Sequence, residues 1–257
     1  MRVALLTTLW KRPALTACAL RSGLLAREAL SGSVDIELLA VGSEGIVSRA
    51  LAEDHGWRYV EAPNRPIGVK LNAGFAALRS LDVDGVVAHG SDDFADLRLV
   101  SAWARASDEG KLFCGLLDMY KVRVGDYRVF HWTGYQGARR GDSIGPWRFV
   151  ASSVLDVLDW APYDPALSRN LDGSMTDKLN ARLPRWKEYS YTVSMKDVGA
   201  SVFDVSTPER ISSWTDIVNS PGVIDGPSWK ELTAFLPHEL SYAIRKQRCP
   251  RSSSEVK

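Results

Sequence analysis

The chain has 257 residues, of which 45% are hydrophobic and 25% are charged, and its formal net charge is +1. This composition is typical of a globular protein with a substantial core, and it excludes a disordered or strongly polybasic chain. The length allows one large α/β domain, or a domain with an appended subdomain. Three widely spaced cysteines, a short apolar N-terminus and the lack of a long apolar run predict a cytoplasmic protein with no membrane segment.

Strands and helices alternate over the first 110 residues. Strands are expected at residues 3–8, 34–41, 57–61 and 85–88, and helices at residues 13–29, 46–55, 68–79 and 96–107. Strands that alternate with helices of this length form βαβ units. We therefore expect an α/β protein with a mostly parallel sheet flanked by helices.

The pattern is less regular beyond residue 110. Further strands are expected at residues 112–119 and 189–195, and further helices at residues 153–158, 171–182 and 228–245. Residues 120–150 are expected to form an irregular segment, rich in aromatic and arginine side chains.

One apolar strand ends at two adjacent carboxylates. The run Val86–Ala88 leads into His89, Gly90 and Ser91, followed by Asp92 and Asp93. Open α/β sheets bind ligands just beyond the carboxyl ends of their strands, and paired carboxylates there suit a cation such as Mg²⁺. The alternative is that the two aspartates cap the next helix, because aspartate is favoured at that position. His89 is expected to pack within the protein.

Polar stretches follow each of the first four strands, at residues 7–13, 41–44, 64–74 and 90–93. In this order they resemble the nucleotide-sugar half of GT-A-fold glycosyltransferases, in particular the inverting, family-2-like enzymes. The resemblance covers residues 3–110 and continues more faintly to about residue 200. It implies a GT-A-like, Rossmann-like sheet with a nucleotide-sugar-binding half (1–110), an acceptor-side half of the same domain (111–200), and a C-terminal helical extension with a basic tail (201–257).

The resemblance implies a nucleoside-diphosphate sugar as donor, and we expect a UDP sugar. The usual aspartate pair after the second strand is replaced by Gly42 and Ser43, and Ser91 stands at the first position of the family's Asp-any-Asp motif. Structural roles compete with donor binding: Thr8 and Arg12 suit a turn and the surface, and Asn72 could satisfy buried backbone groups. The donor-binding residues implied are Thr7, Thr8, Arg12, Ser43, Glu44, Asn64, Lys70, Asn72, Ser91 and Asp92.

Two further roles follow from the resemblance. Asp93, together with Asp92, is expected to hold Mn²⁺ or Mg²⁺ against the diphosphate, while Lys70 contacts that diphosphate. Inverting transfer also needs a general base for the acceptor hydroxyl, and the candidates are Asp172 and Asp177. Asp172 is preferred because it ends an irregular stretch and is free to project into a cleft. Asp177 remains a rival, and the preference of helix N-termini for negative charge explains either residue without catalysis.

The irregular segment carries six basic and two acidic residues interleaved with aromatic side chains. Such a segment suits a polyanionic acceptor with stackable bases. Compact bacteriophage-type glycosyltransferases, some of which modify hydroxymethylated pyrimidines in DNA, are similar in size, and they would act in the host cytoplasm. A glycan acceptor fits the aromatic residues almost as well, and the structural alternative is a loop that packs over the sheet. The acceptor-binding residues expected are Trp132, Tyr135, Arg139, Arg140, Trp147 and Arg148.

Two rival functions remain open from the sequence. A nucleotidyltransferase would also use carboxylates and a metal, but it typically carries a glycine-rich loop after the first strand, and residues 7–13 contain no glycine. A non-catalytic nucleotide-sugar-binding module is compatible with Ser91 in place of an acid.

Overall fold

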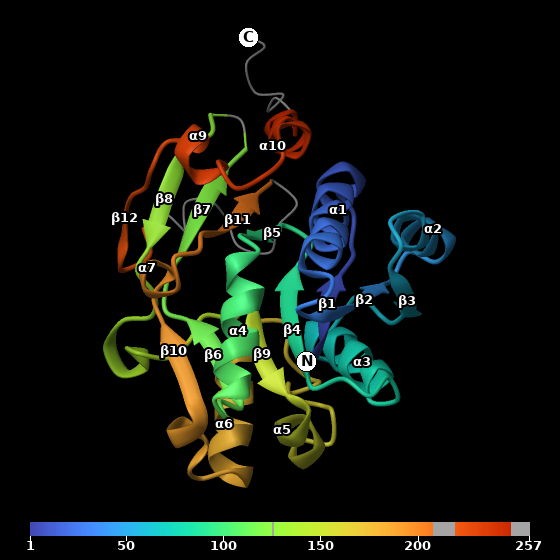
Figure 1. The fold of residues 1–257 in the computed structure, drawn as a ribbon, viewed down its shortest axis with the longest axis vertical. Helices are drawn as coiled ribbons and strands as arrows, with labels where there is room; N and C mark the ends of the chain where they lie inside the picture. Colours follow the sequence, from blue (N-terminus) through green and yellow to red (C-terminus); the bar gives the residue numbers. More distant parts are fainter. Residues whose placement is uncertain (125, 208–218, 248–257) are drawn as a thin grey trace.

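The computed structural model describes residues 1–124, 126–207 and 219–247 (Figure 1). Its largest sheet has seven strands in the order β10-β6-β9-β4-β1-β2-β3. Strand β9 runs antiparallel to its neighbours β4 and β6, whereas the other neighbouring strands run parallel. The strands of this sheet are β1 (Arg2–Thr8), β2 (Asp35–Gly42), β3 (Arg58–Glu61), β4 (Gly85–Gly90), β6 (Phe113–Leu116), β9 (Arg148–Ala151) and β10 (Ser190–Val193).

Helices cover both faces of this sheet. Gly74 of α3 lies against Leu6 of β1. His89 of β4 pairs with Thr7, the residue after Leu6 in β1, so the His89 side chain points to the opposite face of the sheet. There its ring packs against that of Trp57, whose indole N–H donates to the backbone oxygen of Leu20 in α1. Helix α4 lies on that same face (Figure 1). The helices are α1 (Pro13–Leu30), α2 (Ile46–Asp54), α3 (Ile67–Leu78), α4 (Arg98–Asp108), α5 (Ser152–Val157), α6 (Leu171–Arg182), α7 (Met195–Val198), α9 (Trp229–Leu232) and α10 (His238–Arg245), with short 3-10 turns η1 (Gly137–Arg139) and η2 (Trp186–Tyr189).

A second sheet of five strands lies beyond the carboxyl ends of β1 and β4, towards which their arrows point in Figure 1. Its order is β12-β8-β7-β11-β5, and β11 lies between β5 and β7. The sheet therefore joins chain segments that are more than 100 residues apart in sequence. Its strands are β5 (Asp93–Ala95), β7 (Met119–Arg123), β8 (Val129–Trp132), β11 (Val202–Ser206) and β12 (Val223–Asp225).

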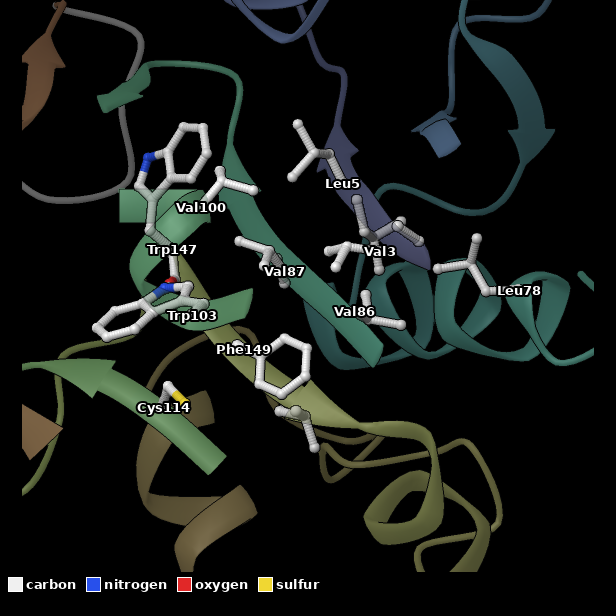
Figure 2. Packing of buried hydrophobic residues seen from close by; sticks show 14 of the residues in the cluster. Val3, Leu5, Leu78, Val86, Val87, Val100, Trp103, Cys114, Trp147 and Phe149 are labelled. Atoms are coloured by element: carbon white, nitrogen blue, oxygen red, sulfur yellow. The ribbon is translucent and has the colours of Figure 1, made fainter. Parts of the chain in front are cut away.

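The main core fills the space between the large sheet and its helices. Figure 2 shows part of it, where Val87 of β4 and Phe149 of β9 lie near Val100 and Trp103 of α4. Trp103 is fully buried, and its indole N–H donates to the backbone oxygen of Trp147 at 2.8 Å. A second cluster of buried apolar side chains joins the smaller sheet to α1 and α10. The second cluster therefore packs the smaller sheet against α1, the helix that follows β1.

The structure corrects four of the predicted elements. The strand expected at residues 112–119 is two strands in different sheets, β6 and β7, separated at Leu117 and Asp118. The segment 120–150 is irregular only in part, because it contributes β7, β8 and β9, whereas residues 133–147 contain only the short turn η1. The helix expected at 228–245 is broken into α9 and α10 by Pro237, which cannot continue a helix. The strand expected to reach Met195 ends at Val193, since Met195 begins α7.

None of the helices in residues 1–124, 126–207 and 219–247 combines the length and apolar character needed to cross a bilayer.

Candidate active site

Three carboxylates meet where the two sheets adjoin. Asp92 lies in the turn after β4, Asp93 begins β5, and Asp204 lies in β11 directly opposite Asp93 in the antiparallel pair. Oxygens of the three side chains lie within 4.8 Å of one another. Asp93 and Asp204 are buried and Asp92 is half-buried. The next helix, α4, begins at Arg98 with Leu97 at its N-cap, so Asp92 and Asp93 do not cap it and the capping alternative is wrong.

The charge of this cluster is only partly compensated by the protein. Arg12 donates to Asp92 at 2.7 Å, Lys121 donates to Asp204 at 3.4 Å, and Asp93 accepts from the backbone N–H of Gly90 at 2.6 Å. Burial raises the pKa of Asp93 well above its usual range, and the nearby Asp92 and Asp204 raise it further. Buried carboxylates that lack a full set of counter-charges suit a hard divalent cation with oxygen ligands. The donor set therefore fits Mg²⁺ or Mn²⁺.

The loop after β1 carries Arg12 to this cluster. Lys11 and Arg12 both have positive φ angles, 53° and 50°, which turn the chain sharply at the carboxyl end of β1. The Arg12 guanidinium then reaches Asp92 and lies 3.4 Å from the hydroxyl of Ser91. Glu44 supports the same loop, because it accepts from the backbone N–H of Lys11 at 2.8 Å. Four of the residues predicted to bind the donor are thus brought together.

Other predicted donor residues have different surroundings. The Lys70 ammonium is buried and donates to protein oxygens alone, two of which belong to Ser43 and Asn64, so the predicted contact with a diphosphate is wrong. The Asn72 amide bonds to both the backbone oxygen and the backbone N–H of Tyr163, at 2.9 and 3.1 Å. Its side chain therefore joins α3 to the segment before α6, as the structural alternative proposed.

A pocket of about 160 Å³ lies beside the carboxylate cluster and reaches Asp172 at the start of α6. Asp93 lines one part of it and Asp172 another. Of the two predicted threonines, Thr8 lines the pocket, whereas Thr7 is fully buried and faces away. The pocket lining is Thr8, Leu71, Ala88, His89, Gly90, Asp93, Gly145, Pro146, Tyr163, Leu171 and Asp172.

The Asp172 carboxylate is held from two sides. The Tyr135 hydroxyl donates to its Oδ2 at 2.5 Å, and the buried Arg148 guanidinium lies 3.6 Å from its Oδ1. Burial raises the pKa of the Tyr135 hydroxyl, and the Asp172 charge raises it further, so this hydroxyl stays protonated and remains a donor. Asp177, the rival base, is exposed and does not line the pocket.

The predicted acceptor residues divide into two groups. Trp132 and Tyr135 pack edge to face at 5.2 Å, and the Arg139 guanidinium covers the Tyr135 ring at 3.6 Å. Arg140 is exposed nearby. Trp147, in contrast, is buried against the ring of His89 on the α4 face, so it cannot reach an acceptor.

Arg148 is the second correction among the predicted acceptor residues. Its side chain is buried, and its guanidinium donates to the side-chain and backbone oxygens of Ser143 at 3.0 and 2.7 Å. It supports Asp172 from within the protein and does not face an acceptor. Its burial follows from its place on β9, a strand between two others in the large sheet.

Sequence reasoning missed Asp204 and Lys121. Asp204 is a single acid in the run Val202–Ser206, and only the pairing of β11 with β5 brings it opposite Asp93. Lys121 lies opposite Asp204 on the neighbouring strand β7. The one signal in the sequence is a lone aspartate in an otherwise apolar strand, because a charge in such a run needs partners.

No family model matches the chain, and no curated protein matches it. Solved structures do match. S. aureus TarS 1–349 in complex with UDP-GlcNAc superposes with a TM-score of 0.54 at 11% sequence identity, covering 91% of this chain and 64% of that one. Its complex with UDP gives a TM-score of 0.51 at 13% identity, covering 81% and 62%.

Glucosyl-3-phosphoglycerate synthase from Mycobacterium tuberculosis, in complex with phosphoglyceric acid, gives a TM-score of 0.51 at 15% identity, covering 84% of this chain and 74% of that one. The chain thus spans less than two thirds of the TarS segment it matches. At these identities the likeness is one of fold. It confirms the predicted GT-A-like α/β fold.

Proposed function

We propose that this protein is an inverting glycosyltransferase that moves a sugar from a UDP sugar to a hydroxyl group of an acceptor. The observation that carries the proposal is the pocket of about 160 Å³ with the carboxylate cluster at one part of its wall and Asp172 at another. This arrangement supports the proposal, because the pocket has carboxylates for the diphosphate end and a separate carboxylate, Asp172, for a base.

The loops that follow β1, β2 and β3 support the proposal that the nucleotide of the donor binds at this edge of the sheet. They bring Arg12, Ser43 and Asn64 to one edge of the sheet, where open α/β sheets bind nucleotides. Two of the similar folds are TarS complexes with UDP and with UDP-GlcNAc. Arg12 and Ser91 are placed to donate hydrogen bonds near Asp92, at the end where the diphosphate would lie.

Asp92, Asp93 and Asp204 are the residues that would hold a divalent cation, which when bound would stabilise the negative charge of the leaving diphosphate. Asp172 accepts the proton of the acceptor hydroxyl as the oxygen of that hydroxyl forms its bond to the anomeric carbon. The bond from that carbon to the diphosphate oxygen breaks, and UDP leaves with the electron pair. Attack from the side opposite the leaving group inverts the anomeric carbon.

Tyr135 and Arg148 prepare Asp172 for this role. They hold its two oxygens from different sides, which limits rotation of the carboxylate. A base held in this way needs little reorganisation before it receives a proton. Asp177 is exposed and lies outside the lining of the pocket, so we assign the base to Asp172.

The acceptor side favours a sugar or another small hydroxyl compound over DNA. Trp132 and Tyr135 offer aromatic surface beside Asp172. Most of the basic side chains of the segment are paired within the protein: Arg139 with Asp142, and Lys121 with Asp204. Affinity for DNA depends on cations that are available to phosphates, and these are largely engaged. Transfer to hydroxymethylated pyrimidines in DNA is the second candidate and is an arm of the test.

The test is release of UDP from UDP-glucose, UDP-galactose and UDP-GlcNAc by the purified chain with Mg²⁺ or Mn²⁺. Radiolabelled sugar is then offered to glycan acceptors, to plain DNA and to hydroxymethylated DNA. Metal-dependent transfer that Asp172→Asn abolishes, with UDP still bound, supports the proposal. UDP binding by the wild type with neither hydrolysis nor transfer would identify a binding module, and no binding of any UDP sugar would overturn the donor assignment.

A further inference from the structure

A buried ammonium group joins the three loops that form the proposed nucleoside site. Lys70 lies in α3, and only 1% of its surface is exposed. Its Nζ donates to the backbone oxygen of Leu9 at 2.6 Å, to the hydroxyl of Ser43 at 3.1 Å and to Oδ1 of Asn64 at 3.0 Å. These three acceptors follow β1, β2 and β3 respectively. One side chain therefore ties together three loops that are far apart in sequence.

The surroundings of this charge differ from those of an ordinary buried lysine. Its direct partners are neutral oxygens, and the charges of Glu44 and Glu61 act on it by Coulombic attraction. Burial lowers the pKa of Lys70 to about 8, although the two glutamates partly oppose this change. Taking an ammonium out of water is unfavourable unless its hydrogen bonds are satisfied. The three loop oxygens satisfy all three donors, which leaves none for a ligand.

The Lys70 ammonium also fixes the orientation of the groups that accept its hydrogen bonds. An ammonium has donors and no acceptor, so the Asn64 amide must direct its oxygen towards Lys70 and its NH₂ group away. The Leu9 oxygen comes just before the sharp turn that carries Arg12 to Asp92. Lys70 thus constrains the residues at the base end of the site and the loop that leads to the carboxylate cluster.

We infer that Lys70 is a positioning residue for the donor: it holds the loops after β1, β2 and β3 in the arrangement that binds the nucleoside, without touching the donor. The inference rests on the proposed function, because it assumes that these loops bind the nucleoside of a UDP sugar. A residue with this role changes the affinity for the donor and leaves the bond-making step at Asp172 nearly intact.

The experiment compares Lys70→Met with Lys178→Met in the full chain. Lys178 is a matched control, since its Nζ also bridges backbone oxygens, those of Ala161 and Tyr163 at 2.7 Å each, but it lies on α6 away from the three loops. Titration calorimetry with UDP and Mg²⁺ gives the affinity, and steady-state kinetics with the UDP sugar separates KM from kcat. We expect Lys70→Met to raise the UDP dissociation constant and the donor KM at least tenfold, with kcat changed severalfold at most.

We expect Lys178→Met to leave the UDP dissociation constant within twofold of the wild-type value. Lys70→Met that binds UDP as tightly as the wild type overturns the inference. A fall in kcat at unchanged donor KM also overturns it, because Lys70 would then act on the chemical step.

A measurement on the wild-type protein keeps the inference testable if Lys70→Met does not fold. The charged groups facing Lys70 are Glu44 after β2 and Glu61 on β3. Loss of the Lys70 proton removes one of its three donors, so UDP affinity is expected to fall as the pH rises through about 8. Constant UDP affinity across that range overturns the inference. A wild-type protein that binds no UDP at any pH overturns the proposed function itself, which is a different result.

Discussion

Replacing Asp93 by asparagine tests the charge balance of the carboxylate cluster. The side chain keeps its shape, and its amide oxygen can still accept from the Gly90 N–H, now 2.6 Å from Asp93 Oδ2. At a pH above the raised pKa of Asp93, the substitution removes one negative charge that is buried near Asp92 and Asp204. Among residues 1–124, 126–207 and 219–247, no cationic side chain forms an ion pair with Asp93, so at that pH we expect the metal-free variant to be more stable than the wild type.

The size of the effect follows from the distances. The charges of Asp92 and Asp204, whose oxygens lie within 4.8 Å of that of Asp93, each repel it by roughly 3 kcal/mol at an effective dielectric constant of about 20. Arg12 and Lys121 offset much of this repulsion from Asp92 and Asp204, which leaves a net gain of about 1–2 kcal/mol for Asp93→Asn. For a chain of this length the gain raises the unfolding temperature by about 3–6 °C.

The pH dependence has a definite sign. Because the pKa of Asp93 is raised in the folded chain, the folded state binds a proton at pH values where the unfolded state has released it. Stability contributed by this group is therefore lost as the pH rises through the folded pKa. A cation that binds the ionised cluster then stabilises the protein more at about pH 8 than at about pH 5.

The assay is thermal unfolding of chelator-treated protein, with and without added Mg²⁺ or Mn²⁺. Asp96→Asn is the matched control, because Asp96 is equally buried but accepts from the backbone N–H and the guanidinium of Arg98 at 2.9 Å each. That variant is expected to lose stability. The reasoning is refuted if metal-free Asp93→Asn unfolds at or below the wild-type temperature, or if the metal stabilises Asp93→Asn as much as the wild type.

Three further predictions concern catalysis and the core. Asp172→Asn is expected to lower kcat about 10²- to 10⁴-fold and to keep the affinity for UDP. Asp177→Asn is expected to leave kcat and UDP affinity unchanged in the same kinetic and calorimetric assays. The reverse result would assign the base to Asp177. Burial lowers the pKa of His89 to about 4. As the pH falls, the imidazole is therefore protonated in the unfolded chain before it is in the folded chain, and the free energy of unfolding falls by about 2 kcal/mol between about pH 7 and about pH 5. His89→Leu should show a smaller fall in urea unfolding, and an equal fall would contradict the assignment. Gly74→Ala places a methyl group 2.5 Å from Leu6 Cδ1 and is expected to cost about 1–3 kcal/mol; wild-type stability in urea would show that the helix shifts freely.

The first four strands could be predicted from the sequence because their signals are local. β1, β2 and β4 each contain an apolar run, and β1, β2 and β3 are each followed directly by a helix of the expected length. The same locality explains why Arg12, Ser91 and Asp92, which are expected at one edge of the sheet, lie together in the structure, since the carboxyl ends of adjacent parallel strands meet at one edge.

The second sheet could not be predicted because its strands pair across long stretches of chain. Asp204 approaches Asp93 only through the antiparallel pairing of β11 with β5. Arg148 and Trp147 stand next to each other in the sequence, yet they point to opposite faces at the start of β9. An arginine-rich, aromatic segment is therefore predicted to be a surface loop when the strands that bury part of it are not known.

The sequence by itself determined an α/β chain with a polar, carboxylate-bearing edge, because periodicity and strand ends are properties of short segments. Only the tertiary structure decided which groups share the site. It placed Asp204 with Asp92 and Asp93, joined Asp172 to Tyr135, and turned Lys70 inward to bind three loops. The physical reason is that each of these contacts joins strands or loops distant in sequence, and their pairing depends on packing of the whole chain.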